Sequence, residues 1–149
     1  MDNRFEDLTT GIAKIYKNIQ KIKKHYMNSL GLKGTHVMCI HFLASNPQGL
    51  TAASLCNMCQ EDKAGISRIL SDLEANGYIY YDAPPEAKRY RSKAILTQKG
   101  QECSAKVNAL IENAVKEGGQ NITDQDREVF YRTLFTIADN LDRICGTLY

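Results

Sequence analysis

The spacing of apolar residues in the first part of the chain predicts a long amphipathic helix. Between residues 3 and 30, apolar side chains recur every three or four positions from Phe5 to Tyr26, so they share one helical face. Lysines occupy the other faces and form either a solvated surface or a positive flank beside a phosphate backbone. Gly31 and Gly34 follow the last periodic position and are expected to end the helix.

Residues 62–77, with the sequence DKAGISRILSDLEANG, predict a helix with one apolar and one polar face. Its apolar stripe consists of Ile66, Ile69, Leu70 and Leu73. The opposite face carries Ala64, Arg68, Ser71 and Ala75, with Ser67 at its flank. Asp62 is suited to cap the N-terminus and Gly77 to end the helix. This composition suits a helix that enters a groove, and it equally suits an ordinary surface helix.

Two shorter helices are predicted before this one. Thr35 is the expected N-cap of the first, and Thr51 is the expected N-cap of the second, which covers residues 52–59. Only Gln60 and Glu61 separate the second from the helix just described. Two helices joined by so tight a turn form a helix-turn-helix.

After Gly77 the pattern changes from a helical to a strand period. Residues 78–81 are rich in tyrosine and predict a strand, and residues 82–87 contain two prolines and predict a turn. A second strand is predicted over residues 88–96, and its first part carries the cations Lys88, Arg89, Arg91 and Lys93. A hairpin that follows a helix-turn-helix is the layout of a winged helix.

Two further helices are predicted in the last third of the chain. Thr97 is the expected cap of a helix over residues 98–117, and a sequence close to a capping box at Thr123 starts a helix that reaches about Thr147. In the last helix the apolar residues step alternately by four and three: Phe130, Leu134, Ile137, Leu141, Ile144 and Leu148. This seam predicts packing against another helix, from this chain or from a second copy.

Length and composition are those of one soluble globular domain. The chain has 149 residues, of which 43% are hydrophobic and 24% charged. No apolar run approaches the roughly 20 residues that a membrane-spanning helix needs. The N-terminus also lacks the basic start and apolar block of a signal peptide. We therefore expect a cytoplasmic protein without a membrane partner.

The net charge of +2 is small, and its distribution is more informative. Residues 1–34 carry a net charge of +4, residues 51–97 are neutral, and residues 98–149 carry −2. The neutral middle section counts against nucleic-acid binding and keeps a protein-interaction module open as an alternative. The basic cluster on the second strand is hidden in that neutral total.

The order of elements resembles the winged helix-turn-helix fold of the multiple antibiotic resistance regulator (MarR) family over essentially the whole chain. The residues that carry the resemblance are Leu55, Ser67-Arg68, Leu73-Glu74-Ala75-Asn76-Gly77-Tyr78-Ile79 and Leu96-Thr97-Gln98-Lys99-Gly100. The hairpin departs from the family's pattern. Where the family usually has an aspartate and two arginines, this chain has Lys88, Arg89 and Tyr90.

The resemblance implies a mainly α fold with a small β-hairpin wing. It assigns residues 1–34 and 98–149 to a dimerisation region and residues 35–97 to a DNA-binding domain. The implied function is a homodimeric regulator of transcription that binds a near-palindromic double-stranded operator, with half-sites about 10 base pairs apart. A repressor released by a small aromatic ligand is the form that the resemblance suggests.

The residues expected to bind DNA lie on the polar face of the 62–77 helix, at the start of the supporting helix, and on the hairpin. They are Thr51, Ser54, Lys63, Ala64, Ser67, Arg68, Ser71, Lys88, Arg89 and Arg91. Arg68 is the candidate for reading a guanine or gripping a phosphate. The alternative for Arg68 is a surface ion pair with Asp72, four residues further on.

The family's ligand pocket lies between the dimerisation helices and the winged domain. The residues of this chain that would line it are Tyr16, Tyr26, Met27, His36 and Phe42. Aromatic residues at these spacings are equally typical of an ordinary core.

The five cysteines, Cys39, Cys56, Cys59, Cys103 and Cys145, make an odd number in a chain without an export signal. Reduced thiols are therefore expected. The family resemblance implies thiol-based redox sensing as an alternative, including a disulfide between subunits through Cys103 or Cys145. Against it, none of the five cysteines has an obvious cationic neighbour in the sequence.

No metal, cofactor or catalytic residue is expected from the sequence. Cys56 and Cys59 are three residues apart, but no second pair of ligands follows to complete a zinc site. The sequence also contains no nucleophile–base–acid arrangement and no phosphate loop, so we expect no enzyme activity.

Overall fold

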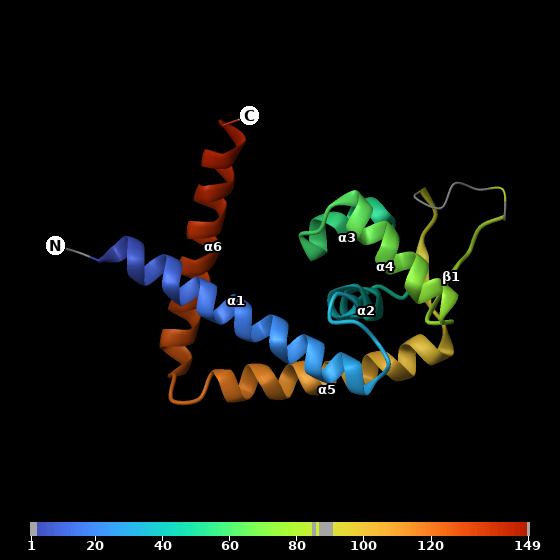
Figure 1. Cartoon of the computed structure of the whole chain (residues 1–149), viewed down its shortest axis with the longest axis horizontal. Helices are drawn as coiled ribbons and strands as arrows, with labels where there is room; N and C mark the ends of the chain where they lie inside the picture. Colours follow the sequence, from blue (N-terminus) through green and yellow to red (C-terminus); the bar gives the residue numbers. More distant parts are fainter. Residues whose placement is uncertain (1–2, 85, 87–90, 149) are drawn as a thin grey trace. The chain divides into compact units, whose positions relative to one another are not determined.

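A computed structural model describes residues 3–84, 86 and 91–148. The described elements are α1 (Arg4–Ser29), α2 (His36–Ser45), α3 (Ala52–Cys59), α4 (Lys63–Ala75), β1 (Ile79–Tyr81), β2 (Ala94–Leu96), α5 (Gln98–Gly118) and α6 (Asp124–Gly146), as Figure 1 shows. The predicted fold class, mainly α with a small hairpin, is confirmed.

The chain divides into two compact units, Met1–Leu110 and Ile111–Tyr149, and the boundary between them falls within α5. The assignment of the two ends of the chain to dimerisation concerns a role of these segments, and it stays a prediction. No helix in the described ranges is long and apolar enough to cross a membrane.

The core of the first unit is formed where α2, α3 and α4 meet (Figure 1). Ile40 and Leu43 of α2, Leu55 of α3, and Ile66 and Leu73 of α4 are each at most 1% exposed. Fully burying an aliphatic side chain stabilises the fold by about 1.5–3 kcal/mol. The apolar stripe of α4 therefore fixes which face of this helix is left outside.

Side chains cap four of the helices where the sequence predicts it. One of the four is α5, where Thr97 Oγ1 accepts the Gly100 N–H at 3.1 Å. Asp62 Oδ1 accepts the Gly65 N–H at 2.6 Å, Thr51 Oγ1 accepts the Ser54 N–H at 3.2 Å, and Thr123 Oγ1 accepts the Asp126 N–H at 3.1 Å. Each bond satisfies a backbone donor that the first helical turn leaves without a partner.

Thr35 is an exception among the predicted caps. It does precede α2, but its hydroxyl makes no capping hydrogen bond within the described residues, and its backbone is already helical. The preceding turn satisfies the donors instead, because the His36 N–H donates to the Lys33 carbonyl oxygen at 3.0 Å. The prediction of a Thr35 side-chain cap is therefore wrong, although the start of the helix is right.

The end of α4 is closed by a glycine in the left-handed conformation. Asn76 is the cap residue, and Gly77 follows with φ of 78°. The Gly77 N–H donates to the Glu74 carbonyl oxygen at 3.0 Å, and the Tyr78 N–H donates to that of Leu73 at 2.9 Å. These two bonds form a Schellman motif, which ends the helix where the glycine predicts it.

The wing is shorter than the sequence predicts. β1 and β2 pair antiparallel, from Ile79 opposite Leu96 to Tyr81 opposite Ala94. Residues 91–93 are not part of a strand, so the second strand predicted over 88–96 begins only at Ala94. In the described residues β1 ends at Tyr81, opposite Ala94, so residues 91–93 have no strand partner in β1, and residues 88–90 lie outside the described part of the chain.

The apolar seams of α1 and α6 lie open in the single chain. The second unit has no buried residue in α6, where Phe130, Leu141 and Ile144 are each about half exposed. In the first unit, Ile15 and Ile19 of α1 are also exposed. Apolar surfaces of this kind mark places where a soluble protein contacts a partner.

Candidate nucleic-acid interface

The outward face of α4 consists of the side chains that the helical period predicts. Lys63, Ala64, Ser67, Arg68 and Ser71 are all exposed. They lie opposite a stripe that is almost completely buried. The sequence therefore predicts the outward side chains of α4 correctly, and their contact with DNA stays a prediction.

A cleft of about 390 Å³ runs along this face of α4. Its lining comes from two segments. The segment before α2 contributes Lys33 and Thr35. The residue before the cap of α4, and α4 itself, contribute Glu61, Gly65, Ser67, Arg68, Ile69, Ser71 and Asp72. Lys33 and Thr35 are residues that the sequence reasoning missed. A cation directly before a predicted helix start is the signal that was available, since phosphates favour helix N-termini.

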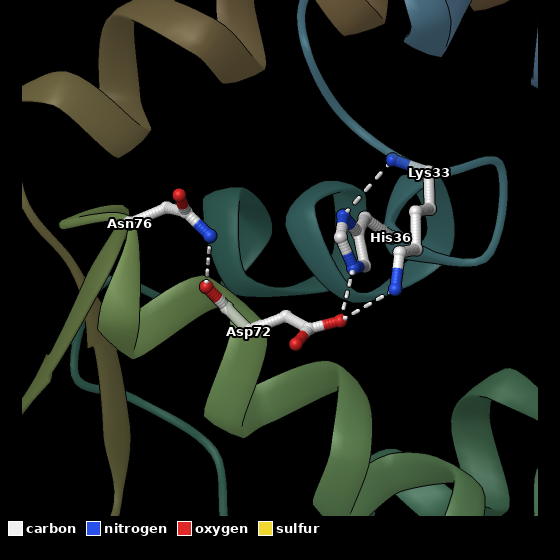
Figure 2. Close-up of polar contacts among 4 residues, drawn as sticks. All are labelled: Lys33, His36, Asp72 and Asn76. Carbon is white, nitrogen blue, oxygen red and sulfur yellow. Dashed lines mark hydrogen bonds and ion pairs between the residues drawn. The ribbon is translucent and has the colours of Figure 1, made fainter.

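Lys33, His36 and Asp72 form a polar cluster that joins the start of α2 to α4 (Figure 2). The Lys33 Nζ donates to Asp72 Oδ2 at 3.3 Å, and His36 Nε2 lies 3.5 Å from the same oxygen. The hydrogen bond from Lys33 lowers the pKa of the Asp72 carboxyl group. Within the described residues no ion pair joins Arg68 to Asp72. The guanidinium of Arg68 thus stays on the exposed face of α4.

His36 is a packed, neutral residue in this cluster. The Lys33 N–H donates to His36 Nδ1 at 3.2 Å, so the ring proton of the neutral form lies on Nε2. Nε2 is buried and has no hydrogen bond among the described residues, because the 3.5 Å contact to Asp72 is too long to be a good one. Burial lowers the pKa of His36, although Asp72 acts in the opposite direction. The histidine therefore packs between the start of α2 and α4 without carrying a charge near neutral pH.

The two polar residues at the start of α3 are partly buried and bonded to each other. The Thr51 hydroxyl donates to Ser54 Oγ at 3.1 Å while it accepts the Ser54 N–H. Their side-chain oxygens already have partners in the free protein. A phosphate that binds at this point would therefore contact the second lone pair of these hydroxyl oxygens, or backbone N–H groups of the first turn that have no partner within the helix.

The described part of the basic wing is limited to its last residues. Arg91 and Lys93 are exposed and lie just before β2. Lys88 and Arg89, which are also expected to bind DNA, lie outside the described residues.

The base of the wing is attached to the end of α4 through Thr97 and Gly100. The Thr97 hydroxyl donates to the Gly77 carbonyl oxygen at 2.6 Å and accepts the Gly100 N–H at 3.1 Å. The Lys99 Nζ donates to the Asn76 carbonyl oxygen at 2.7 Å. The Leu-Thr…Gly sequence after the hairpin therefore fixes the base of the hairpin against the end of α4.

The five residues predicted to line a ligand pocket have different surroundings. Met27 and His36 are buried in the first unit, and Tyr26 and Phe42 are partly buried. Tyr16 is 65% exposed on α1, and it lies about 16 Å from Met27 along the helix at 1.5 Å per residue. A single small ligand would therefore reach only some of them, and their role stays a prediction. Within the described residues, no group of three potential ligands could hold a metal ion.

Comparisons with known proteins agree with this fold. The family model described as MarR family matches residues 30–89. No curated protein sequence matches the chain significantly.

Several solved structures share the fold at low sequence identity. One, described as a MarR family transcriptional regulator from Listeria monocytogenes in complex with a 26-mer DNA, has a TM-score of 0.80 at 20% identity, over 95% of this chain and 90% of that chain. A MarR protein from Peptoclostridium difficile has a TM-score of 0.82 at 17% identity, over 96% and 92%. A MarR family regulator from Neisseria meningitidis has a TM-score of 0.80 at 16% identity, over 99% and 100%. Residues 30–89 therefore match the MarR family model, and the chain shares the fold of these MarR structures over nearly its whole length.

Proposed function

We propose that this protein is a homodimeric, sequence-specific regulator of transcription that represses by binding double-stranded DNA and is released by a small ligand. The observation that carries the DNA-binding part is the exposed polar face of α4, with Arg68 beside a cleft that also contains Lys33. A relative with this fold, from Listeria monocytogenes, is described in complex with a 26-mer DNA.

In this proposal α4 enters the major groove and contributes few but specific contacts. Arg68 is the residue for a guanine edge, since a bidentate arginine–guanine pair discriminates by about 1–3 kcal/mol. Ser67, Ser71 and Lys63 supply further contacts to bases or phosphates. With one arginine on this face, much of the affinity must come from backbone contacts by the basic wing residues Lys88, Arg89 and Arg91 and from the second copy.

Dimerisation is proposed because the apolar positions of α1 and α6 lie open in the single chain. Ile15 and Ile19 on α1, and Phe130, Leu141 and Ile144 on α6, each expose at least 42% of their surface. A two-fold dimer would present two copies of α4 to half-sites about 10 base pairs apart on a near-palindromic operator. The ligand would act by changing the distance between the two recognition helices.

The test is selection of bound DNA from a random pool, followed by affinity measurements on the selected sequence at two salt concentrations. Arg68→Ala should weaken binding by about tenfold or more and relax the preference at one position per half-site. Arg68→Lys keeps the charge but loses the bidentate fork, so a guanine contact predicts loss with both variants. Lys106→Ala on α5 removes the same charge from an exposed position outside the cleft and serves as the control.

A second measurement tests the wing. Arg89→Ala should weaken binding to all sequences alike and reduce the dependence of affinity on salt by about one counterion. Selection that yields no enriched sequence, together with no binding at low salt, would exclude a DNA-binding function. Addition of small phenolic compounds to the bound complex then tests release by a ligand.

A further inference from the structure

Lys33 is held at two points by the polar cluster that joins the start of α2 to α4 (Figure 2). Its backbone N–H donates to His36 Nδ1 at 3.2 Å, and its Nζ donates to Asp72 Oδ2 at 3.3 Å. His36 Nε2 lies 3.5 Å from the same Asp72 oxygen. Lys33 and His36 therefore compete for one carboxylate oxygen, and both Lys33 and Asp72 line the cleft along α4.

The two competitors differ in how easily they leave Asp72. The Lys33 side chain is 73% exposed and has a flexible stem, so its ammonium group is free to turn toward an anion in the cleft. Exposed ion pairs of this kind contribute little to stability. The His36 side chain is 5% exposed, and its Nε2 is buried without a hydrogen bond among the described residues. Departure of Lys33 therefore leaves Asp72 Oδ2 to this nitrogen.

The proton that charges His36 has a defined position. Nε2 carries the proton of the neutral ring, because Nδ1 accepts the Lys33 N–H. A second proton therefore enters at Nδ1, where it takes the place of the Lys33 N–H. The charged ring also attracts Asp72 more strongly, because an imidazolium is a charge-assisted donor. One proton thus releases Lys33 from the cluster at both of its contacts.

We propose that Lys33 is a phosphate-binding residue that is paired with Asp72 in the free protein, and that His36 takes up one proton from solvent when Lys33 moves from Asp72 to a DNA phosphate. The proton adds to Nδ1, and Asp72 Oδ2 accepts the Nε2–H of the resulting imidazolium. This proposal rests on the proposed function, because the anion is a phosphate of DNA bound along α4. Since binding takes up protons, the affinity for DNA rises as the pH falls.

The charges around His36 agree with this exchange. Burial lowers the pKa of His36, Asp72 raises it, and the charge of Lys33 lowers it further. Movement of Lys33 away from the cluster therefore raises this pKa. β2 has no titratable side chain, and the other elements in contact with α2 carry Arg68 on α4, Lys23 and Lys24 on α1, Cys56 and Cys59 on α3, and Cys103 on α5. Among the described residues, only Asp72 and Lys33 act on the pKa of His36.

The first experiment detects the competition in the free protein, without DNA. The pKa of His36 is measured by NMR titration of the imidazole in the wild type and in Lys33→Met, which keeps the apolar stem and removes the charge. We expect a pKa below 6.5 in the wild type and a higher pKa in Lys33→Met. Lys106→Met on α5 removes the same charge from an exposed position and should leave the pKa of His36 unchanged. An unchanged pKa in Lys33→Met would refute the competition for Asp72.

The second experiment counts the protons taken up with the selected DNA, by calorimetry in two buffers that differ in ionisation enthalpy. We expect uptake of at most one proton per copy of α4, which makes the affinity rise by up to about tenfold per copy for each fall of one pH unit. In His36→Gln the amide oxygen accepts the Lys33 N–H and the side chain takes up no proton, so the uptake should disappear. His25→Gln changes an exposed histidine of α1 and should keep the uptake.

Lys33→Met separates phosphate binding from the proton. This variant should take up no proton on binding, and the dependence of its affinity on salt should fall by about one counterion per copy of α4. Lys106→Met should retain both wild-type properties. A salt dependence and an affinity equal to those of the wild type in Lys33→Met would show that Lys33 binds no phosphate.

Circular dichroism checks that each variant is folded, and the pKa of wild-type His36 with and without DNA provides the same test without a substitution. A higher pKa in the complex supports the exchange, and an equal or lower pKa refutes it. Proton uptake that persists in His36→Gln also refutes it. Wild-type protein that binds no DNA at any pH or salt concentration would refute the proposed function, while the competition between Lys33 and His36 in the free protein would stand.

Discussion

Gly100 offers a sharp test of how the wing base is attached to α5. It is the third residue of α5, and its N–H donates to the Thr97 hydroxyl at 3.1 Å. A Cβ at this position would overlap the carbonyl oxygen of Tyr78 and lie 3.0 Å from Leu96 Cδ2. The Tyr78 oxygen already accepts the Thr97 N–H at 3.0 Å, so it cannot move away freely.

The size of the effect of Gly100→Ala follows from two opposing contributions. Alanine is the better helix former by up to about 1 kcal/mol. Overpacking costs about 1–3 kcal/mol, and the upper part of this range applies here because the obstacle is backbone. We therefore expect a net loss of about 1–2 kcal/mol in the free energy of unfolding. For a chain of this length that corresponds to a Tm lower by about 2–8 °C.

The assay is urea denaturation and thermal melting followed by circular dichroism. Gly118→Ala is the matched control, since it lies in the same helix, its φ is compatible with alanine, and an added Cβ would meet nothing within 4 Å. The control should be as stable as the wild type or slightly more stable. If Gly100→Ala melts at or above the wild-type Tm, the close packing of α5 on the wing base is not what requires glycine.

Two further predictions concern His36 and Asp62. Burial lowers the pKa of His36 below 6.5 in the folded protein. As the pH drops through 6.5, His36 is therefore protonated in the unfolded chain before it is protonated in the folded one, and the free energy of unfolding should fall. His36→Gln should reduce this fall in urea denaturations between about pH 7.5 and pH 5.5, whereas the same change at the exposed His25 should not. Asp62→Ala removes the acceptor of the Gly65 N–H and should lower stability by about 1 kcal/mol, and an unchanged urea midpoint would contradict the cap.

The sequence by itself determined the features that depend on near neighbours. The caps at Asp62, Thr51 and Thr123 are hydrogen bonds across three residues, so the local sequence contains both partners. The apolar period of α4 likewise decides which face is buried, because any compact partner must cover that stripe. The exposed Arg68 could be named for the same reason.

Tertiary structure alone decided the contacts between residues far apart in the chain. Lys33 meets Asp72 across 39 positions and Cys39 meets Cys59 across 20, and no local pattern fixes such pairs. The length of β2 also depended on its partner, since β1 offers only three residues to pair. Helix period and capping specify an element and its outer face, whereas the packing of α2 against α3 and α4 decides which polar side chains and thiols become neighbours.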